Sequence, residues 1–349
     1  MTHMRKTIWT ILQYIIFLGG GIFLVWWQLK NMTGAERIEF NTAFKNANYW
    51  VVLPVVIMSV LSHLSRGMRW KILMQPLGYT PKLKNVFAAL MVGYLANSAI
   101  PRLGEILKCT LLARYEKLRV DNLVGTILVE RTFDLLCYLA FIGITVLIQI
   151  TVVGNFVRKE FSTIASGAGI YFWITVASGV GFLLLMIYVI KKLMRKYPQN
   201  KIFYKINQFF NGIAAGFLAI KNLKQRRAFV LHTLFIWLMY LLQIYVGFSA
   251  MQGTAHLSMA AACSVLSLAT LAMIATPGGI GSFPIFVMKV LGMYAISTSV
   301  GQAFGWLMWG VSSGIIITCG LSALLLLPLM NRITTLPKQE PILQKNITD

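Results

Sequence analysis

Six charged side chains lie within or beside apolar sequence in one part of the chain. They are Arg102, Glu105, Lys108, Glu130, Arg131 and Asp134. Charged groups inside a membrane segment are energetically costly and usually face protein or water, so each is a functional hypothesis by default. This set is therefore the first candidate for binding or coupling chemistry.

Two of these carboxylates have the spacing of a shared helix face. Glu130 and Asp134 are four residues apart, whereas Arg131 lies about 100° away and can point to an adjacent element. The pattern leaves several functions open: a proton or cation relay, a clamp that holds Arg102, or a phosphate site that uses the arginine fork. The structural alternatives are an internal salt-bridge network that fixes the preceding segment to this one, and simple placement at the membrane interface.

The elements that must position these charges are defined by two interruptions in apolar sequence, almost half a chain apart. The first spans residues 99–105 and the second residues 275–281. Proline removes a helix donor and glycine permits turns, so each cluster disfavours a continuous helix. The candidate backbone positions are Pro101, Gly104, Pro277, Gly278, Gly279 and Gly281.

The second interruption differs from the first because it contains no acid or base. Its glycines can expose amide groups at a broken helix end, where the helix dipole favours an anion. Close packing of small residues against neighbouring helices is the structural alternative. The first interruption thus offers charge, and the second offers backbone and shape.

The composition indicates a polytopic membrane protein. Hydrophobic residues make up 57% of the 349 residues and charged residues only 12%, where a soluble domain carries roughly 25% charged residues. The net charge of +22 comes from loops beside apolar runs, where basic residues set topology and meet anionic lipids. We therefore expect no nucleic-acid partner.

The scattered cysteines and histidines give no metal or redox spacing. The cysteines are Cys109, Cys137, Cys263 and Cys319, and we expect free, buried thiols without disulfides. We also expect no metal and no cofactor.

Six apolar segments are long enough to span a bilayer, which takes about 20 residues. They cover residues 8–29, 49–66, 122–150, 169–190, 228–250 and 301–328. Two further segments, 85–113 and 258–293, contain the interruptions. Segment 8–29 starts like a signal peptide but is too long for one, so we expect it to remain as the first span.

Loop charges decide how the two interrupted segments behave. Loop 66–84 is basic without an acid, and loop 191–227 carries ten Lys or Arg and no acid, so both are expected in the cytoplasm. A full crossing by segment 85–113 would place Arg114, Lys117 and Arg119 outside, whereas a hairpin that enters and returns keeps them inside. The same argument makes segment 258–293 a hairpin from the outer side.

The predicted fold is therefore all-α, with about six full transmembrane helices and two re-entrant helical hairpins in an inverted repeat, a plan common among secondary transporters. Residues 1–349 form a single membrane domain. Its first repeat covers 8–150, its second, inverted repeat covers 169–328, and 329–349 is a short cytoplasmic tail. Both termini are expected in the cytoplasm, and the hairpin tips are expected to meet near the midplane.

The order and separation of the motifs resemble those of the flippase-like membrane family that contains the transmembrane flippase part of lysylphosphatidylglycerol synthase. The residues that carry the resemblance are Pro101, Arg102, Gly104 and Glu105, then Glu130, Arg131 and Asp134, then Pro277, Gly278, Gly279, Ile280 and Gly281. The resemblance covers about residues 8–328. It implies translocation of a lipid or lipid-linked glycan, a central cavity formed by the two re-entrant elements, and polar motif positions at Arg102, Glu105, Glu130, Arg131 and Asp134.

Two departures from the family pattern affect the expected function. Ser282, Phe283 and Pro284 stand where many relatives carry a glutamate after the second glycine motif. Bifunctional members also carry a cytosolic aminoacyl-transferase domain, whereas this chain ends about twenty residues after its last span. We therefore expect no enzymatic lipid aminoacylation.

The leading functional hypothesis is a lipid flippase or translocator of the inner, cytoplasmic membrane. It would move an anionic phospholipid or lipid-linked glycan through a polar cavity between the hairpins. The alternative is a non-transporting membrane scaffold partner of a lipid-modifying or glycosyltransferase enzyme. The expected partners are membrane lipids with anionic headgroups, together with a second copy of the chain or a lipid-modifying enzyme. An intramembrane hydrolase or transferase lacks support, because the sequence offers no Ser/His/Asp or metal arrangement.

Overall fold

The computed structural model describes residues 19–21, 23–28, 30–100, 102–149 and 223–331. Within these ranges the chain forms helices and no strand, which confirms the all-α prediction. The predicted fourth span at 169–190, the cytoplasmic tail from 332 onward, the start of the first span and Pro101 lie outside the described residues.

After the first span, the described residues contain nine α-helices with defined bounds. They are α2 (Gly34–Lys45), α3 (Val52–Met74), α4 (Leu83–Ala99), α5 (Leu103–Glu116), α6 (Val120–Ile148), α10 (Arg226–Phe248), α11 (Met259–Ala275), α12 (Ser282–Gly292) and α13 (Thr298–Met330). Short 3-10 turns, η1 (Tyr49–Val51), η2 (Gln75–Leu77) and η3 (Pro277–Gly279), extend or join them.

Within the described ranges, four helical segments are long and apolar enough to cross a membrane. They are Tyr49–Leu77, Val120–Ile148, Arg226–Phe248 and Thr298–Met330. Segment Tyr49–Leu77 corrects the predicted span 49–66, because the helix continues well beyond residue 66. The loop predicted at 66–84 begins only after η2. Arg66 and Arg69 consequently lie on α3 rather than in a loop.

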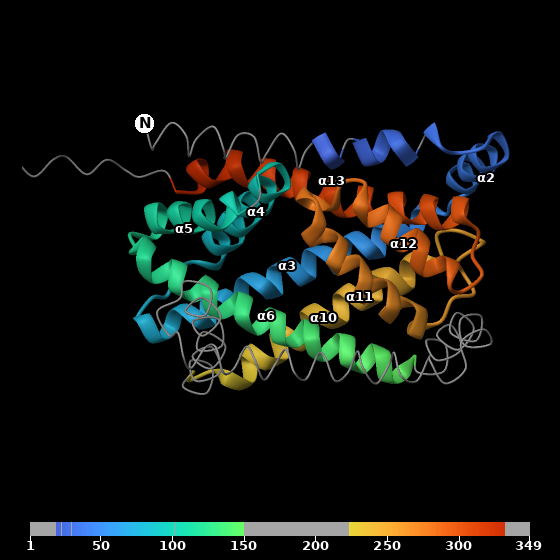
Figure 1. The fold of residues 1–349 in the computed structure, drawn as a ribbon. Helices are drawn as coiled ribbons and strands as arrows, with labels where there is room; N and C mark the ends of the chain where they lie inside the picture. The colour runs from blue at the N-terminus through green and yellow to red at the C-terminus, as the bar shows by residue number, and fades with distance from the viewer. Residues whose placement is uncertain (1–18, 22, 29, 101, 150–222, 332–349) are drawn as a thin grey trace, which may run out of the picture.

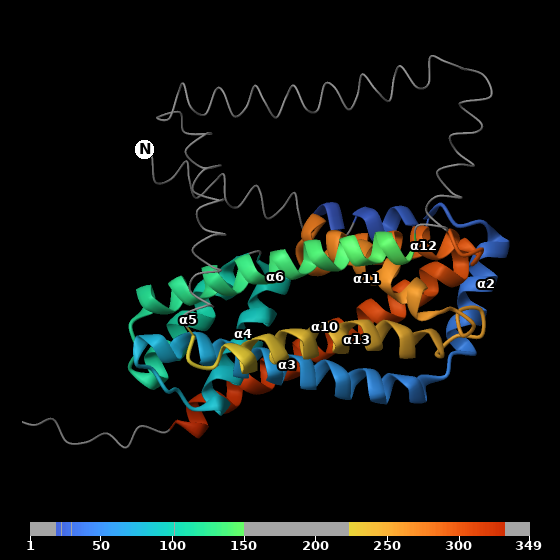
Figure 2. The ribbon, with the colours of Figure 1, turned by 90° about the horizontal axis from the view of Figure 1, so that it is seen from below.

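Each interrupted segment folds as a pair of packed helices. The first hairpin is α4 and α5, and the second is α11 and α12, joined through η3. Figures 1 and 2 show the long helices running along the molecule, with the first hairpin at one end and the second at the other. The two tips meet, because α4 contacts η3 and a Cβ on Gly278 would lie 3.7 Å from the Cα of Ser98.

Helix contacts in the two halves correspond. Helix α3 packs on α10, which runs in the opposite direction (Figure 1). The pairs α3/α4, α5/α6 and α4/α13 have the counterparts α10/α11, α12/α13 and α11/α6. An inverted repeat produces this correspondence, in which each helix of one half makes the contacts that its equivalent makes in the other half. The repeat boundaries at 8–150 and 169–328 stay predictions, because the fourth span lies outside the described residues.

The first hairpin turns tightly because its two helices approach at glycines. A Cβ on Gly104 would overlap the carbonyl oxygen of Gly93 on α4. The N–H of Gly104, near the start of α5, donates to Asn97 Oδ1 at 2.8 Å. Arg102 occupies the turn with φ of 70°, a left-handed conformation that is uncommon for a residue other than glycine.

Buried apolar side chains join each hairpin to its neighbouring helices. Val86, Cys109 and Leu112 of the first hairpin pack with Trp70 and Met74 of α3. The larger core joins the second hairpin to α10 and α13. All four cysteines are free, as expected, but only Cys109 and Cys263 are buried, whereas Cys137 and Cys319 are partly exposed.

Candidate functional site

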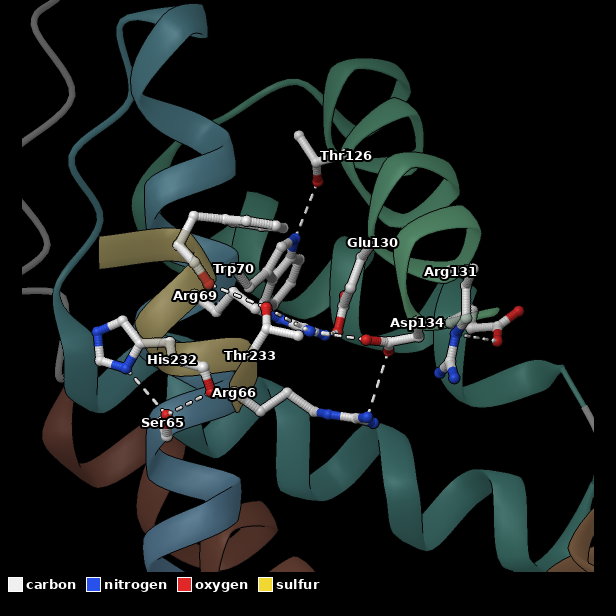
Figure 3. A network of polar contacts seen from close by, with 12 residues as sticks. Ser65, Arg66, Arg69, Trp70, Thr126, Glu130, Arg131, Asp134, His232 and Thr233 are labelled. Carbon is white, nitrogen blue, oxygen red and sulfur yellow. Dashed lines mark hydrogen bonds and ion pairs between the residues drawn. The ribbon is translucent and has the colours of Figure 1, made fainter. Parts of the chain in front are cut away.

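A buried network of five charges joins α3, α5 and α6 beside the first hairpin (Figure 3). We define this charge network as Arg66, Arg69, Lys108, Glu130 and Asp134. Its central member is Arg69, whose side chain is fully buried. Arg69 Nη2 lies 3.3 Å from Glu130 Oε1, and its Nη1 lies 2.7 Å from Asp134 Oδ1. One arginine thus bridges both carboxylates, as their shared helix face allows.

The remaining cations approach the same carboxylates from two sides. Lys108 Nζ on α5 lies 3.2 Å from Glu130 Oε2. Arg66 Nη2 lies 3.3 Å from Asp134 Oδ2, while its Nη1 donates to the hydroxyl of Tyr94 on α4 at 3.0 Å. Each carboxylate therefore has two cationic partners.

Uncharged side chains from neighbouring helices hold the cations in place. Arg69 Nη1 also donates to Thr233 Oγ1 on α10 at 3.2 Å. The ammonium group of Lys108 lies 4.6 Å from the centre of the Trp70 ring, within cation–π range. The indole N–H of Trp70 donates to Thr126 Oγ1 at 2.9 Å. These contacts reduce the freedom of the cations to separate from α6.

The charge network carries an excess of positive charge. Three cations face two carboxylates, which leaves a formal charge of +1. A buried charge is stabilised when it is paired and hydrogen-bonded. Two donors and one acceptor of the network, the Nε atoms of Arg66 and Arg69 and Oδ1 of Asp134, have no hydrogen-bond partner among the described residues, so the net charge of +1 is what favours an anion. The network is therefore suited to attract an anion.

A second ion pair lies outside the buried network. Arg131 Nε is 3.2 Å from Glu105 Oε1, and their side chains are 40% and 33% exposed. Arg131 does point to an adjacent element, as its position on α6 predicts. The pair links α6 to the first turn of α5, close to the hairpin tip.

The predicted site residues therefore fall into three groups. Glu130 and Asp134 belong to the charge network, and Glu105 and Arg131 pair with each other. Arg102 is exposed and has no ion pair within the described part of the chain. The carboxylates of α6 do not clamp Arg102, because Arg66, Arg69 and Lys108 occupy their oxygens.

Sequence reasoning missed Arg66 and Arg69 as site residues. Both were assigned to a cytoplasmic loop because basic residues after an apolar run usually mark its end. Their spacing of three residues was a usable signal, since residues three and four apart share a helix face and could match Glu130 and Asp134.

Hydrogen bonds between uncharged groups hold the second hairpin tip in place. Trp309 Nε1 on α13 donates to the carbonyl oxygen of Gly278 at 2.8 Å. Gln28 Nε2 on the first span donates to the carbonyl of Gly281 at 2.9 Å, and Gln302 donates to Gln28 at 2.8 Å.

The glycines of this tip adopt the backbone conformations that favour glycine. Gly278, Gly279 and Gly281 have φ of 61°, 71° and 72°. The N–H of Gly279 bonds to the carbonyl of Thr276 at 3.0 Å, so this amide is already used within the turn. Pro277 begins η3.

These features define a multi-pass, all-helical membrane protein with two meeting hairpins and a buried charge network. A family model described as the lysylphosphatidylglycerol synthase TM region matches residues 10–320, and the chain belongs to this family. A curated relative is the UPF0104 membrane protein MJ1595 of Methanocaldococcus jannaschii. It is 23% identical over 281 residues, which cover 74% of this chain and 79% of the relative. No solved structure matches the chain.

Proposed function

We propose that the protein is a flippase or translocator that moves an anionic phospholipid or lipid-linked glycan across the cytoplasmic membrane. The observation that carries the proposal is the excess positive charge of the charge network beside the first hairpin tip. Ionisable residues inside membrane segments mark substrate or ion pathways. Membership of the lysylphosphatidylglycerol synthase TM family supports the membrane setting.

The partly exposed pair provides the contact surface for a headgroup. Glu105 and Arg131 are 33% and 40% exposed, whereas Arg66 and Asp134 in the charge network are only 14% and 15% exposed and its other three members are almost completely buried. Arginine presents a planar fork that matches phosphate. We propose that a headgroup phosphate displaces Glu105 from Arg131 and is attracted by the excess charge, while the lipid tail stays in the bilayer.

The proposed orientation places the base of the first hairpin in the cytoplasm. Helices α4, α5 and α6 begin or end there (Figure 1), and the basic residues at these ends are Lys82, Lys84, Arg114, Lys117 and Arg119. The positive-inside rule assigns such an end to the cytoplasmic side. Both termini would then be cytoplasmic.

Replacing Arg131 with glutamine is expected to lower the transport rate about tenfold, the effect of losing one hydrogen bond to a charged group, worth about 1.5 kcal/mol. The partly exposed ion pair should contribute little to folding, so abundance should stay normal. The measurement is the initial rate at which a fluorescent phosphatidylglycerol in the outer leaflet of proteoliposomes becomes inaccessible to an external quencher.

The matched control is Arg119→Gln, which removes another ion-paired arginine at the start of α6. Its side chain is 75% exposed and pairs with Asp121, away from the charge network. We expect its transport rate to equal that of the wild type. Equal rates for Arg131→Gln and Arg119→Gln at equal abundance would contradict the proposed headgroup contact, whereas a wild-type rate no higher than that of protein-free vesicles would favour the scaffold function.

A further inference from the structure

A histidine lies beside the charge network and takes no part in its ion pairs. His63 is on α3, three residues before Arg66, so the two side chains share a side of that helix. The ring of His63 lies against that of Tyr94 on α4, with centroids 5.2 Å apart. The hydroxyl of Tyr94 in turn accepts a hydrogen bond from Arg66 at 3.0 Å. The three side chains therefore form one group at the edge of the charge network.

The side of α3 that carries His63 faces the interior of the protein. The exposed stripe of this helix consists of Leu53, Ile57 and Leu61, which are spaced four residues apart. His63 is about 200° around the helix from Leu61 and points to the opposite side. The residue is partly exposed, and its Nδ1 atom is buried without a hydrogen-bond partner among the described residues. Nearby charges, rather than a hydrogen bond at this nitrogen, therefore determine whether the ring carries a proton.

The helices packed on α3 offer His63 no free carboxylate. The titratable side chains that face this part of α3 are Tyr94 from α4, Glu130 and Asp134 from α6, and His232 and Tyr240 from α10. Helix α13, which also packs on α3, has no charged residue. Both carboxylates already have two cationic partners each. A proton on His63 would add a fourth cation to three and raise the formal charge of the group from +1 to +2.

An anion at the proposed headgroup contact would change this balance. Arg131 and Asp134 are three residues apart on α6, and Asp134 holds Arg66 (Figure 3). A phosphate bound to Arg131 therefore lies close to the group that contains His63. Like charges repel strongly in a poorly polar interior, and a nearby opposite charge favours the protonated imidazole. Histidine is the side chain whose charge changes between about pH 5 and 8, so its protonation can respond to the bound headgroup.

We propose that His63 takes up a proton when an anionic headgroup binds, so that the protein binds the lipid anion together with a proton. The proton comes from water and adds to a ring nitrogen, so that one positive charge enters the group with the negative charge of the headgroup. The inference rests on the proposed function, because the headgroup at Arg131 supplies the charge to which His63 responds. Coupling between two ligands is reciprocal, so lipid binding becomes tighter as the pH falls through the range in which histidine titrates.

The test measures proton uptake directly by calorimetry. Purified full-length protein in detergent is titrated at neutral pH with dioctanoyl phosphatidylglycerol, in two buffers that differ in ionisation enthalpy. The difference between the two heats gives the number of protons taken up per bound lipid. We expect uptake approaching about one proton, the capacity of a single imidazole. The affinity should accordingly fall by up to about tenfold per unit rise in pH, and dioctanoyl phosphatidylcholine should cause no uptake.

Histidine variants assign the proton to one ring. His63→Gln keeps a polar side chain but cannot take up the proton, so it should bind the lipid without uptake and without the pH dependence. His256→Gln is the matched control, because His256 is exposed between α10 and α11, and it should keep the wild-type uptake. The reciprocal variant replaces His3, His232 and His256 with glutamine and leaves His63 alone of the four histidines. It should also keep the uptake, and it tests the assignment independently if His63→Gln does not fold.

The outcomes separate this inference from the proposed function. Binding of phosphatidylglycerol without proton uptake would overturn the role of His63 and leave the transport function standing. Uptake that survives in His63→Gln but disappears in Glu105→Gln would also overturn it, because the proton would then go to the carboxylate that the headgroup displaces from Arg131. A wild type that takes up the proton but moves no lipid in vesicles would contradict transport alone. A wild type that binds no phosphatidylglycerol would contradict both.

Discussion

Replacing Glu130 with glutamine is expected to destabilise the protein by about 3–5 kcal/mol, the usual cost of removing one partner from a buried ion pair. Glu130 is 1% exposed and holds both Arg69 and Lys108. Without its charge, three cations would face the single carboxylate of Asp134. The measurement is the thermal unfolding midpoint of the purified protein in detergent, together with its abundance in the membrane.

A second substitution separates charge imbalance from lost packing. Lys108→Met removes one cation and keeps an apolar stem of similar length against Trp70. We expect the double variant Lys108→Met with Glu130→Gln to be more stable than Glu130→Gln alone, because two cations and one carboxylate restore the formal charge of +1 that the wild-type network carries. Asp121→Asn, which removes an exposed carboxylate from the same helix, should leave the midpoint unchanged. A Glu130→Gln midpoint equal to that of Asp121→Asn would contradict the buried network.

Replacing Gly104 with alanine is expected to destabilise the first hairpin by about 3 kcal/mol, at the upper end of the usual cost of overpacking. The added methyl group would overlap the backbone carbonyl of Gly93, and a backbone atom cannot move aside as a flexible side chain can. Helices α4 and α5 must separate, which also strains the hydrogen bond from Gly104 to Asn97. The readouts are the unfolding midpoint and the transport rate of the fraction that remains folded.

Gly125→Ala provides the control for the hairpin glycine. Gly125 lies inside α6, where an added Cβ meets nothing within 4 Å. Alanine is a better helix former than glycine by about 1 kcal/mol, so this variant should be as stable as the wild type or slightly more stable. Equal destabilisation by both substitutions would show that the close approach of Gly93 and Gly104 does not determine hairpin stability.

The helical hairpins were predictable because their signals are local. Proline and glycine interrupt helices wherever they cluster in apolar sequence, and the turns occur at residues 99–103 and 275–282, inside or next to the two interruptions. The length of the apolar runs likewise predicted α6, α10 and α13 within a few residues. No partner segment needs to be known for these predictions.

The end of α3 was not predictable by the same reasoning. Counting charges along the sequence places Arg66 and Arg69 in a loop, because an unpaired arginine inside the membrane has a high free-energy cost and the sequence does not show its partners. Glu130 and Asp134, more than sixty residues later, supply those partners only after the chain has folded. The helix therefore continues to Met74 against its local charge signal.

The candidate site was predictable only in part. The spacing of Glu130 and Asp134 gave their shared face correctly, and Arg69 contacts both. Their partners required knowledge of how α3 and α5 pack on α6. Arg102, the tip residue that the sequence makes most prominent, lies outside the charge network because the left-handed turn exposes it.

Transport of lipids with anionic headgroups is the function that we propose for this chain. It is tested most directly by comparing the initial transbilayer rates of fluorescent phosphatidylglycerol and phosphatidylcholine in vesicles that contain the wild-type protein with the rates in protein-free vesicles. The excess positive charge predicts that the protein accelerates movement of phosphatidylglycerol, and does so more than for phosphatidylcholine. Rates equal to those of protein-free vesicles for both lipids, or a preference for the zwitterionic lipid, would contradict the account.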